Sequence, residues 1–186
     1  MKYLLISLGV VLLIIFGIVI FNRGGTKTVT TTNSKKPITL LDYATNNNAV
    51  VQYSLEGPIN AVEDHRTTQI TISPTSRIVT VFKGYQFQAL VSRTYPNDNN
   101  SYNEFLTALN RAGFTKEHKL EVAVSEASIC PTASRTNYRL IDNGKDVMNL
   151  WSATCTTGSF GGSIPLTTTL FQTQIPNYGT VISSAH

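Results

Sequence analysis

Charged residues are scarce in this 186-residue chain, and acidic residues are missing from its first part. Only 14% of the residues are charged. Positions 1–37 hold five basic residues and no acidic one, whereas positions 38–186 hold ten Lys and Arg against eleven Asp and Glu, a balance of −1. The formal charge of +4 therefore comes from the N-terminal segment. Because a nucleic-acid-binding domain carries clustered basic residues, this distribution argues against a nucleic-acid partner.

Cysteine and histidine are also few, with two cysteines and three histidines. Neither Cys130 nor Cys155 has a second cysteine two or four residues away, and no histidine lies at ligand spacing, so the pattern of a zinc site is missing. We therefore assign no metal ligand and no cofactor. An even pair of cysteines predicts a Cys130–Cys155 disulfide if the domain is translocated, and two ordinary buried thiols if it is cytosolic.

Catalytic motifs are missing as well. The glycine-rich stretch 158–163 lacks the Lys-Ser/Thr of a phosphate loop and the Gly-x-Ser-x-Gly order of a nucleophile elbow. We expect it to be a flexible loop with one apolar tip, Phe160. The polar cluster 63–66 pairs His65 with carboxylates, but it precedes a predicted strand and is expected to be a solvated loop. We predict no catalytic residue, and His65, Arg66 and Phe160 are the candidates for binding loops.

What the chain does have is one long uncharged run, at residues 3–21. At about 1.5 Å per residue, a helix of this length nearly spans a bilayer core of roughly 30 Å. A cleaved signal peptide has a shorter apolar region and a small-residue cleavage site, and no such site follows Phe21. A soluble core helix would need a polar face. The run therefore predicts an uncleaved signal-anchor that contacts the lipid bilayer.

The anchor defines the expected organisation of the chain. We predict a transmembrane helix within residues 1–25, a Thr- and Lys-rich linker over 26–37, and one folded domain over 38–186. The basic residues on both sides of the span leave the orientation open, because those after it favour a cytoplasmic domain. Low charge with much Thr, Ser and Asn fits an extracytoplasmic β-rich domain better, and we predict that location at the cell membrane.

Short strands dominate the predicted domain. The alternation of apolar and polar residues predicts strands near 50–55, 67–73, 77–82 and 85–95, and further strands near 120–124 and 166–172. A two-residue loop near Lys83-Gly84 would place Phe82 opposite Tyr85 and Thr80 opposite Phe87, and a bulged three-residue loop fits equally well. The segment from Pro176 onward is expected to be frayed. The predicted class is α+β, a mostly antiparallel sheet with one packed helix.

The helix and the second hairpin are the strongest local signals. Ser101 and Glu104 match a capping box, the apolar stripe of the helix follows at helical spacing, and Gly113 provides a stop. Asn143-Gly144 is the preferred pair for a type I′ turn. Extending the hairpin outward without a bulge puts five residues on the core face: Tyr138, Leu140, Val147, Trp151 and Ala153. The same register brings Cys155 near Cys130.

The anchor that ends Phe-Asn-Arg-Gly-Gly, the Thr-rich linker and the helix sequence Tyr-Asn-Glu-Phe-Leu-Thr-Ala-Leu-Asn-Arg-Ala-Gly-Phe carry a resemblance. They resemble uncharacterised membrane-anchored extracytoplasmic proteins of Saccharibacteria and related Patescibacteria. The resemblance covers the layout and about twenty residues around the helix, and it implies no activity or site. The layout is also similar to type IV pilins, but it lacks their Gly-Phe processing junction and the glutamate within the apolar run.

These observations predict a single-pass, membrane-anchored extracytoplasmic binding or interaction module of the cell envelope. Its partner would be an envelope protein or a glycan. Two alternatives remain open at this point: an envelope hydrolase whose site is assembled from distant residues, and a pilin-like structural subunit. The hydrolase requires His65 or His118 within hydrogen-bond reach of a Ser, Asp or Glu in a concave pocket.

Overall fold

The computed structural model describes residues 38–185 except 45, 47, 121–130 and 157. All of these residues belong to one compact unit, which extends over 37–186. In this part of the chain no helix is both long enough and apolar enough to cross a membrane. The predicted span at residues 3–21, the linker and most of the strand predicted near 120–124 lie outside the described residues.

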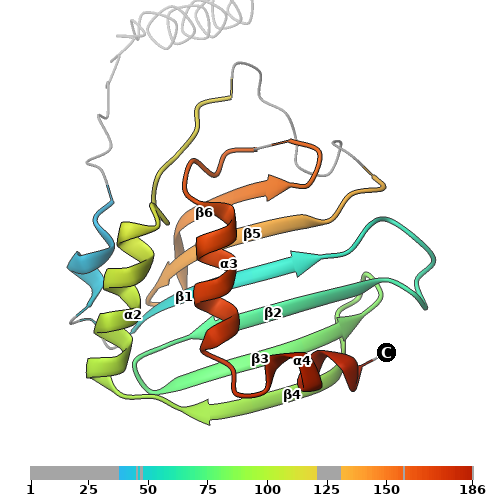
Figure 1. Cartoon of the computed structure of the whole chain (residues 1–186), viewed down its shortest axis with the longest axis horizontal. Coiled ribbons are helices and arrows are strands. Elements are labelled where there is room, and N and C mark those ends of the chain that lie inside the picture. Colours follow the sequence, from blue (N-terminus) through green and yellow to red (C-terminus); the bar gives the residue numbers. More distant parts are fainter. Residues whose placement is uncertain (1–37, 45, 47, 121–130, 157, 186) are drawn as a thin grey trace, which may run out of the picture. The chain divides into compact units, whose positions relative to one another are not determined.

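A six-stranded sheet forms the centre of the domain (Figure 1), and every neighbouring pair of strands is antiparallel. The strand order is β4-β3-β2-β1-β5-β6. The strands are β1 (Ala49–Glu56), β2 (Arg66–Ile72), β3 (Ser76–Lys83), β4 (Gln88–Pro96), β5 (Arg135–Asp142) and β6 (Lys145–Ala153). The predicted antiparallel α+β class is confirmed, although the described part of the chain contains more helices than the one expected.

The helices lie on one face of this sheet (Figure 1). They are the 3-10 turn η1 (Leu40–Tyr43), α2 (Asn99–Arg111), α3 (Ile164–Thr173) and α4 (Tyr178–Ser183). The core fills the space between these helices and the sheet. There, Phe171 of α3 stacks on Tyr53 of β1 with ring centroids 5.4 Å apart, and meets Phe105 of α2 edge-on at 5.3 Å.

Alternation along the central strands gives the sheet two different faces. On β1, Val51 and Tyr53 point into the core, where they pair with Ile72 and Ile70 of β2 and with β5 on the other side. The alternate residues of β1, Gln52, Ser54 and Glu56, point to the opposite side of the sheet. We call this second side the open face, meaning the side chains of Gln52, Ser54 and Glu56 and those paired beside them on β2, β5 and β6.

Helix α2 confirms the predicted helix and corrects its start. The N-cap is Asp98, not Ser101, because the Asp98 carboxylate accepts a hydrogen bond from the Ser101 backbone N–H at 2.9 Å. That bond lowers the pKa of the Asp98 carboxyl group. The predicted apolar stripe is buried, and the helix ends as expected. Gly113 has a φ of +77°, and the Phe114 N–H returns to the Leu109 carbonyl at 3.1 Å, as in a Schellman ending.

The β5–β6 hairpin keeps the predicted turn but not the predicted register. Asn143 and Gly144 both have positive φ, 49° and 74°, as a type I′ turn requires. A bulge between Leu140 and Ile141 then shifts the pairing by one residue, so that Leu140 pairs with Met148. A shift of one residue exchanges the two faces of a strand. The core face of β6 is therefore Met148, Leu150 and Ser152. The predicted core position is wrong for Ala153, whereas Trp151 is buried on the other face and Val147 still packs against the core.

The β3–β4 hairpin also differs from its predicted form. Strand β3 ends at Lys83 and β4 begins at Gln88, so a four-residue loop joins them instead of the predicted two- or three-residue loop. Phe82 pairs with Ala89, and Thr80 pairs with Ser92. Gly84 takes a φ of +67° in this loop, and its backbone packs against Val62.

The C-terminal segment differs most from its predicted structure. The strand predicted over 166–172 is helix α3, and the tail expected to be frayed contains α4. The three consecutive threonines favour a strand, but Thr167 and Phe171 lie four residues apart, and both are buried on the core side of α3. Pro165 in the first turn also suits a helix start. Tertiary packing overrides the β propensity of this segment.

Cys155 follows the end of β6, and Cys130 lies outside the described residues. The predicted disulfide therefore stays a prediction. The unbulged register that the sequence analysis used to bring the two cysteines together is not the register of the hairpin.

Candidate functional site

Three ranks of polar side chains cross the open face at its centre. The strand register aligns Gln69, Ser54 and Asn137 in the middle rank. Gln52 lies between Thr71 and Arg139 on one side, and Glu56 lies between Thr67 and Arg135 on the other. Between these ranks the surface is hollowed, with a volume of about 280 Å³. We call this depression the sheet hollow; its uncharged polar lining is Gln52, Ser54, Thr67, Gln69, Asn137 and Asn149.

The hollow has a simple physical cause. Ser54 is the shortest side chain at the crossing point, and longer side chains from β2, β5 and β1 itself surround it. Strands β1, β2 and β5 are interior strands of the sheet, hydrogen-bonded on both sides, so the floor is held by backbone pairing. A short residue among long ones on a rigid sheet leaves a depression that does not depend on a mobile loop.

Two oxygen atoms in the lining have no hydrogen-bond partner in the described part of the chain. They are the Thr67 hydroxyl and the Asn137 side-chain carbonyl, and both atoms are buried. Thr67 is 4% exposed. A buried polar atom without a partner costs about 1–3 kcal/mol, and most buried polar atoms in native proteins are paired. Two orphaned oxygens on residues that line one hollow therefore require an explanation.

The charged groups of the hollow are already paired with one another. The Arg139 guanidinium donates to both carboxylate oxygens of Asp146 at 2.7–3.0 Å, and to the Gln52 side-chain oxygen at 2.9 Å. Glu56 accepts from Arg135 at 2.7 Å. The hollow consequently presents balanced charge, with its arginines committed to carboxylates of the same protein.

An exposed aromatic ring lies at the edge of the hollow. Phe87 lines it, is 55% exposed, and meets Phe82 edge-on with ring centroids 5.6 Å apart. Its φ is 55°, in the left-handed region. The other two described non-glycine residues with positive φ are asparagines, which tolerate that region, whereas a large aromatic residue does so at a cost of about 1–2 kcal/mol. The loop thus holds an exposed ring in a strained conformation.

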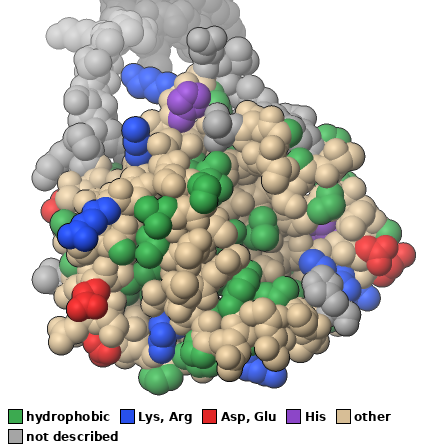
Figure 2. All heavy atoms as spheres, viewed as in Figure 1, with side chains coloured by type: hydrophobic (Ala, Val, Ile, Leu, Met, Phe, Trp, Pro, Cys, Tyr) green, Lys and Arg blue, Asp and Glu red, His purple; other side chains and the backbone are tan. Residues whose placement is uncertain are grey.

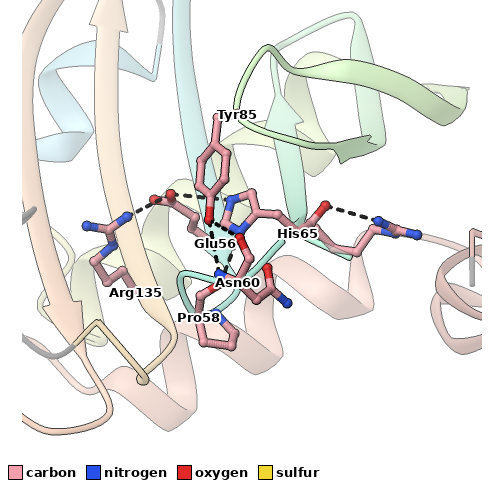
Figure 3. Close-up of polar contacts among 7 residues, drawn as sticks. Glu56, Pro58, Asn60, His65, Tyr85 and Arg135 are labelled. Carbon is pink, nitrogen blue, oxygen red and sulfur yellow. Dashed lines mark hydrogen bonds and ion pairs between the residues drawn. The ribbon is translucent and has the colours of Figure 1, made fainter. Parts of the chain in front are cut away.

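Glu56 also belongs to a second polar cluster at the end of β1 (Figure 3). His65 is 2% exposed; its Nδ1 lies 3.1 Å from the Pro58 carbonyl and its Nε2 lies 3.5 Å from Glu56 Oε1. Tyr85 stacks on the imidazole with ring centroids 4.2 Å apart, and its hydroxyl bonds to the Asn60 backbone. These contacts tie the β1–β2 loop to the β3–β4 loop that carries Phe87.

The structure corrects the predicted binding loops. His65 is buried and not solvated. Arg66 donates to the backbone carbonyls of Glu63, His65 and Ala185 and so holds its own loop against the C-terminal segment. Phe160 is 2% exposed and stacks on Tyr138 at 3.8 Å, so the expected apolar tip is a core residue. His118 is exposed, with Nδ1 3.2 Å from the Gly158 carbonyl. None of these side chains lines the sheet hollow.

The other surfaces give no comparable signal. A larger hollow of about 440 Å³ lies beside Ser152 and Ile164, but none of the orphaned buried oxygens of the described residues lines it. On the helix-covered side, Figure 2 shows Lys and Arg side chains spread singly among the described residues, with no continuous basic block. That distribution gives no support for a polyanion-binding surface.

Sequence reasoning missed the hollow because its residues have no motif. Outward-facing Ser, Thr, Gln and Asn are ordinary on a half-solvated antiparallel sheet. Only the register brings Thr67, Ser54 and Asn137 together, although Ser54 and Asn137 are 83 residues apart along the chain. The sequence contained one weak signal. The outward positions of the strands that prove to be central hold amides and hydroxyls, whereas exposed strands often carry charged residues there.

Comparison with known proteins gives no independent guide to the site, since no family model, curated protein or solved structure matches the chain.

Proposed function

We propose that this protein is a membrane-anchored binding module of the cell envelope that takes its ligand in the sheet hollow. The observation that carries the proposal is that Thr67 and Asn137, two residues that line a concave surface over interior strands, each hold an orphaned oxygen. Each oxygen is itself buried, so a side-chain rotation at Thr67 or Asn137 must first turn it toward the hollow; a ligand with hydrogen-bond donors would then pair with it and recover the free energy that folding spends on burying it. Ligand sites are typically concave and largely formed before binding, as this hollow is.

The direct test is a map of where ligands bind. The full chain, isotopically labelled and reconstituted in phospholipid nanodiscs, is titrated with panels of short oligosaccharides and short peptides. The NMR signals of side-chain amides report the site, and we expect Asn137, Asn149 and Gln52 to shift together. Asn103 is the internal reference, because its side-chain oxygen is also orphaned but lies on α2, outside the hollow. Shifts at Asn103 alone, or at no amide with any panel, would refute the proposal.

The alternative of an envelope hydrolase rests on one contact, the 3.5 Å approach of His65 Nε2 to Glu56 Oε1. Three features speak against it: His65 is buried under Tyr85, it does not line the hollow, and the Glu56 oxygen is shared with Arg135. We expect His65→Ala to lower the free energy of unfolding by about 1–3 kcal/mol, because it leaves Glu56 with one partner fewer and opens a cavity. If the protein turned over an envelope substrate, and His65→Ala abolished that turnover without unfolding the protein, the hydrolase alternative would be supported instead.

The location of the module is part of the proposal. The uncharged run at residues 3–21 supports an anchor, and the cysteine pair supports an oxidising, extracytoplasmic compartment. We expect the protein to stay in the membrane pellet after an alkaline carbonate wash, and to show no free thiol when denatured without reductant. A soluble product beginning near Arg23 would indicate that the signal is cleaved. Two titratable thiols in protein isolated from its native host would refute the predicted disulfide.

A further inference from the structure

We infer that the ligand of the sheet hollow is a neutral glycan, bound with one sugar ring against Phe87. This inference rests on the proposed binding function and adds the chemical class of the ligand. Three properties of the hollow lead to it: its charge balance, the kind of polar groups that line it, and the exposed ring beside it.

The charge balance selects a neutral ligand. Glu56 and Asp146 line the hollow together with Arg139, and each carboxylate has an arginine partner within 2.7 Å. A phosphate or a carboxylate ligand would need a guanidinium free to form a bidentate pair, but Arg139 already uses its donors on Asp146 and Gln52. A cationic ligand would have to displace an arginine from its carboxylate. A ligand without charge avoids both costs.

The lining groups match hydroxyls. Side-chain amides and hydroxyls both donate and accept, and so do the hydroxyl groups of a sugar, so each can pair with the other in either direction. The amides and hydroxyl of Gln69, Ser54 and Asn149 line the hollow as donors and acceptors for sugar O–H groups, and the buried oxygens of Thr67 and Asn137 would add acceptors once their side chains rotate toward the ligand. A peptide is favoured less. Peptides are usually bound at free sheet edges or in apolar grooves, and the hollow lies over interior strands.

Phe87 provides the apolar half of the site. A pyranose ring has a face of C–H groups beside its hydroxyl rim, and an exposed aromatic ring covers such a face by dispersion and by removing apolar surface from water. Two features hold the Phe87 ring near the polar floor: its left-handed backbone and its edge contact with Phe82. Phe82 pairs with Thr67 in the strand register. The strained backbone at Phe87 is then explained by binding, because this conformation keeps the ring beside the polar floor.

The test measures equilibrium binding of maltotriose, cellotriose and triacetylchitotriose to the full chain in phospholipid nanodiscs, with no glycoside detergent present. We expect at least one of the three to bind with a dissociation constant of roughly 0.1–1 mM, as befits a small open site. Trigalacturonic acid, an acidic trisaccharide, should bind at least about tenfold more weakly because it brings charge to a site of paired charges.

Variants at position 87 separate recognition from folding. Phe87→Gly suits the left-handed backbone and removes the ring, and it should weaken glycan binding about tenfold. Phe87→Tyr keeps the ring and should bind within about twofold of the parent. Leu166→Ala is the control, because Leu166 is an exposed apolar residue of α3 that does not line the hollow.

The possible results of these experiments distinguish the glycan inference from the proposed binding function. Glycan binding that Phe87→Gly weakens and Phe87→Tyr retains supports the inference, and glycan binding indifferent to Phe87→Gly overturns it. Peptide binding that moves the Asn137 amide signal, without any neutral glycan binding, overturns the inference and leaves the proposed function standing. The failure of every panel to move that signal overturns both.

Discussion

The Thr67 hydroxyl allows a structural role to be distinguished from a binding role. Its hydroxyl oxygen is buried without a partner in the hollow, and the same is true of Thr167 in the core beneath α3. Natural sequences accept such a cost at functional sites more readily than elsewhere. The two threonines are therefore a matched pair, one at the proposed site and one away from it.

We predict that Thr67→Val and Thr167→Val each leave the free energy of unfolding unchanged or raise it by about 1 kcal/mol, because a methyl group replaces a hydroxyl that has no partner. Only Thr67→Val should weaken ligand binding. Denaturant unfolding gives the first quantity and titration gives the second. A loss of more than about 1 kcal/mol in Thr67→Val would mean that the hydroxyl has a partner in the free protein, and the argument from orphaned atoms would fail.

At the scale of the element, the glycine-rich stretch 158–163 is a packed connection. A side chain at Gly158 would place its Cβ 2.3 Å from the Trp151 carbonyl oxygen and 2.7 Å from its ring. At Gly162 the corresponding distance to the Gly113 carbonyl is 2.5 Å. Glycine is needed here for close approach, which is why Phe160 turns into the core and the stretch does not form the expected loop with an exposed tip.

We predict that Gly158→Ala lowers the free energy of unfolding by at least about 2 kcal/mol, since the residue has a φ of +61° and the new methyl group meets backbone. Gly179→Ala is the matched control. Nothing lies within 4 Å of its Cβ position in α4, so alanine should stabilise the helix by about 0.5–1 kcal/mol. Thermal or denaturant unfolding of the two variants gives the comparison, and equal effects would contradict the packing described for the stretch.

Local signals predicted some elements well and others poorly, for physical reasons. Helix α2 was predictable because its apolar stripe and its Gly113 stop all act within a few residues of sequence. The bulge at Leu140 was not, because it depends on how the whole strand packs. Helix α3 was read as a strand because threonine propensity outweighed the four-residue spacing of Thr167 and Phe171. The hollow could not be predicted, since it depends on the registers of several strands at once.

At the scale of the whole molecule, tyrosines in the core give stability a definite dependence on alkaline pH. Burial raises the pKa of Tyr138 to about 12 and raises the pKa of Tyr53 and Tyr102 as well. An unfolded tyrosine has a pKa of about 10. Because the folded pKa is the higher one, this contribution to stability is complete below pH 10 and is lost as the pH rises through the folded value.

We therefore predict that the free energy of unfolding falls steadily above about pH 10, with the buried tyrosines ionising together with unfolding. Tyrosinate absorbance and far-UV circular dichroism, recorded on the same samples, give the two curves. Ionisation of Tyr53, Tyr102 and Tyr138 near pH 10 with the dichroism unchanged would show that the core does not exclude water as described.

The central claim is that the sheet hollow is where this protein binds its ligand. The most direct measurement is the dissociation constant of the ligand that shifts the side-chain amides most, compared between Asn137→Ala and Asn103→Ala. Both substitutions remove an orphaned, buried amide oxygen from a partly buried residue, but only Asn137 lines the hollow. The account predicts that Asn137→Ala weakens binding about tenfold, the loss of one good hydrogen bond, while Asn103→Ala leaves it unchanged. Equal affinity in the two variants would contradict it.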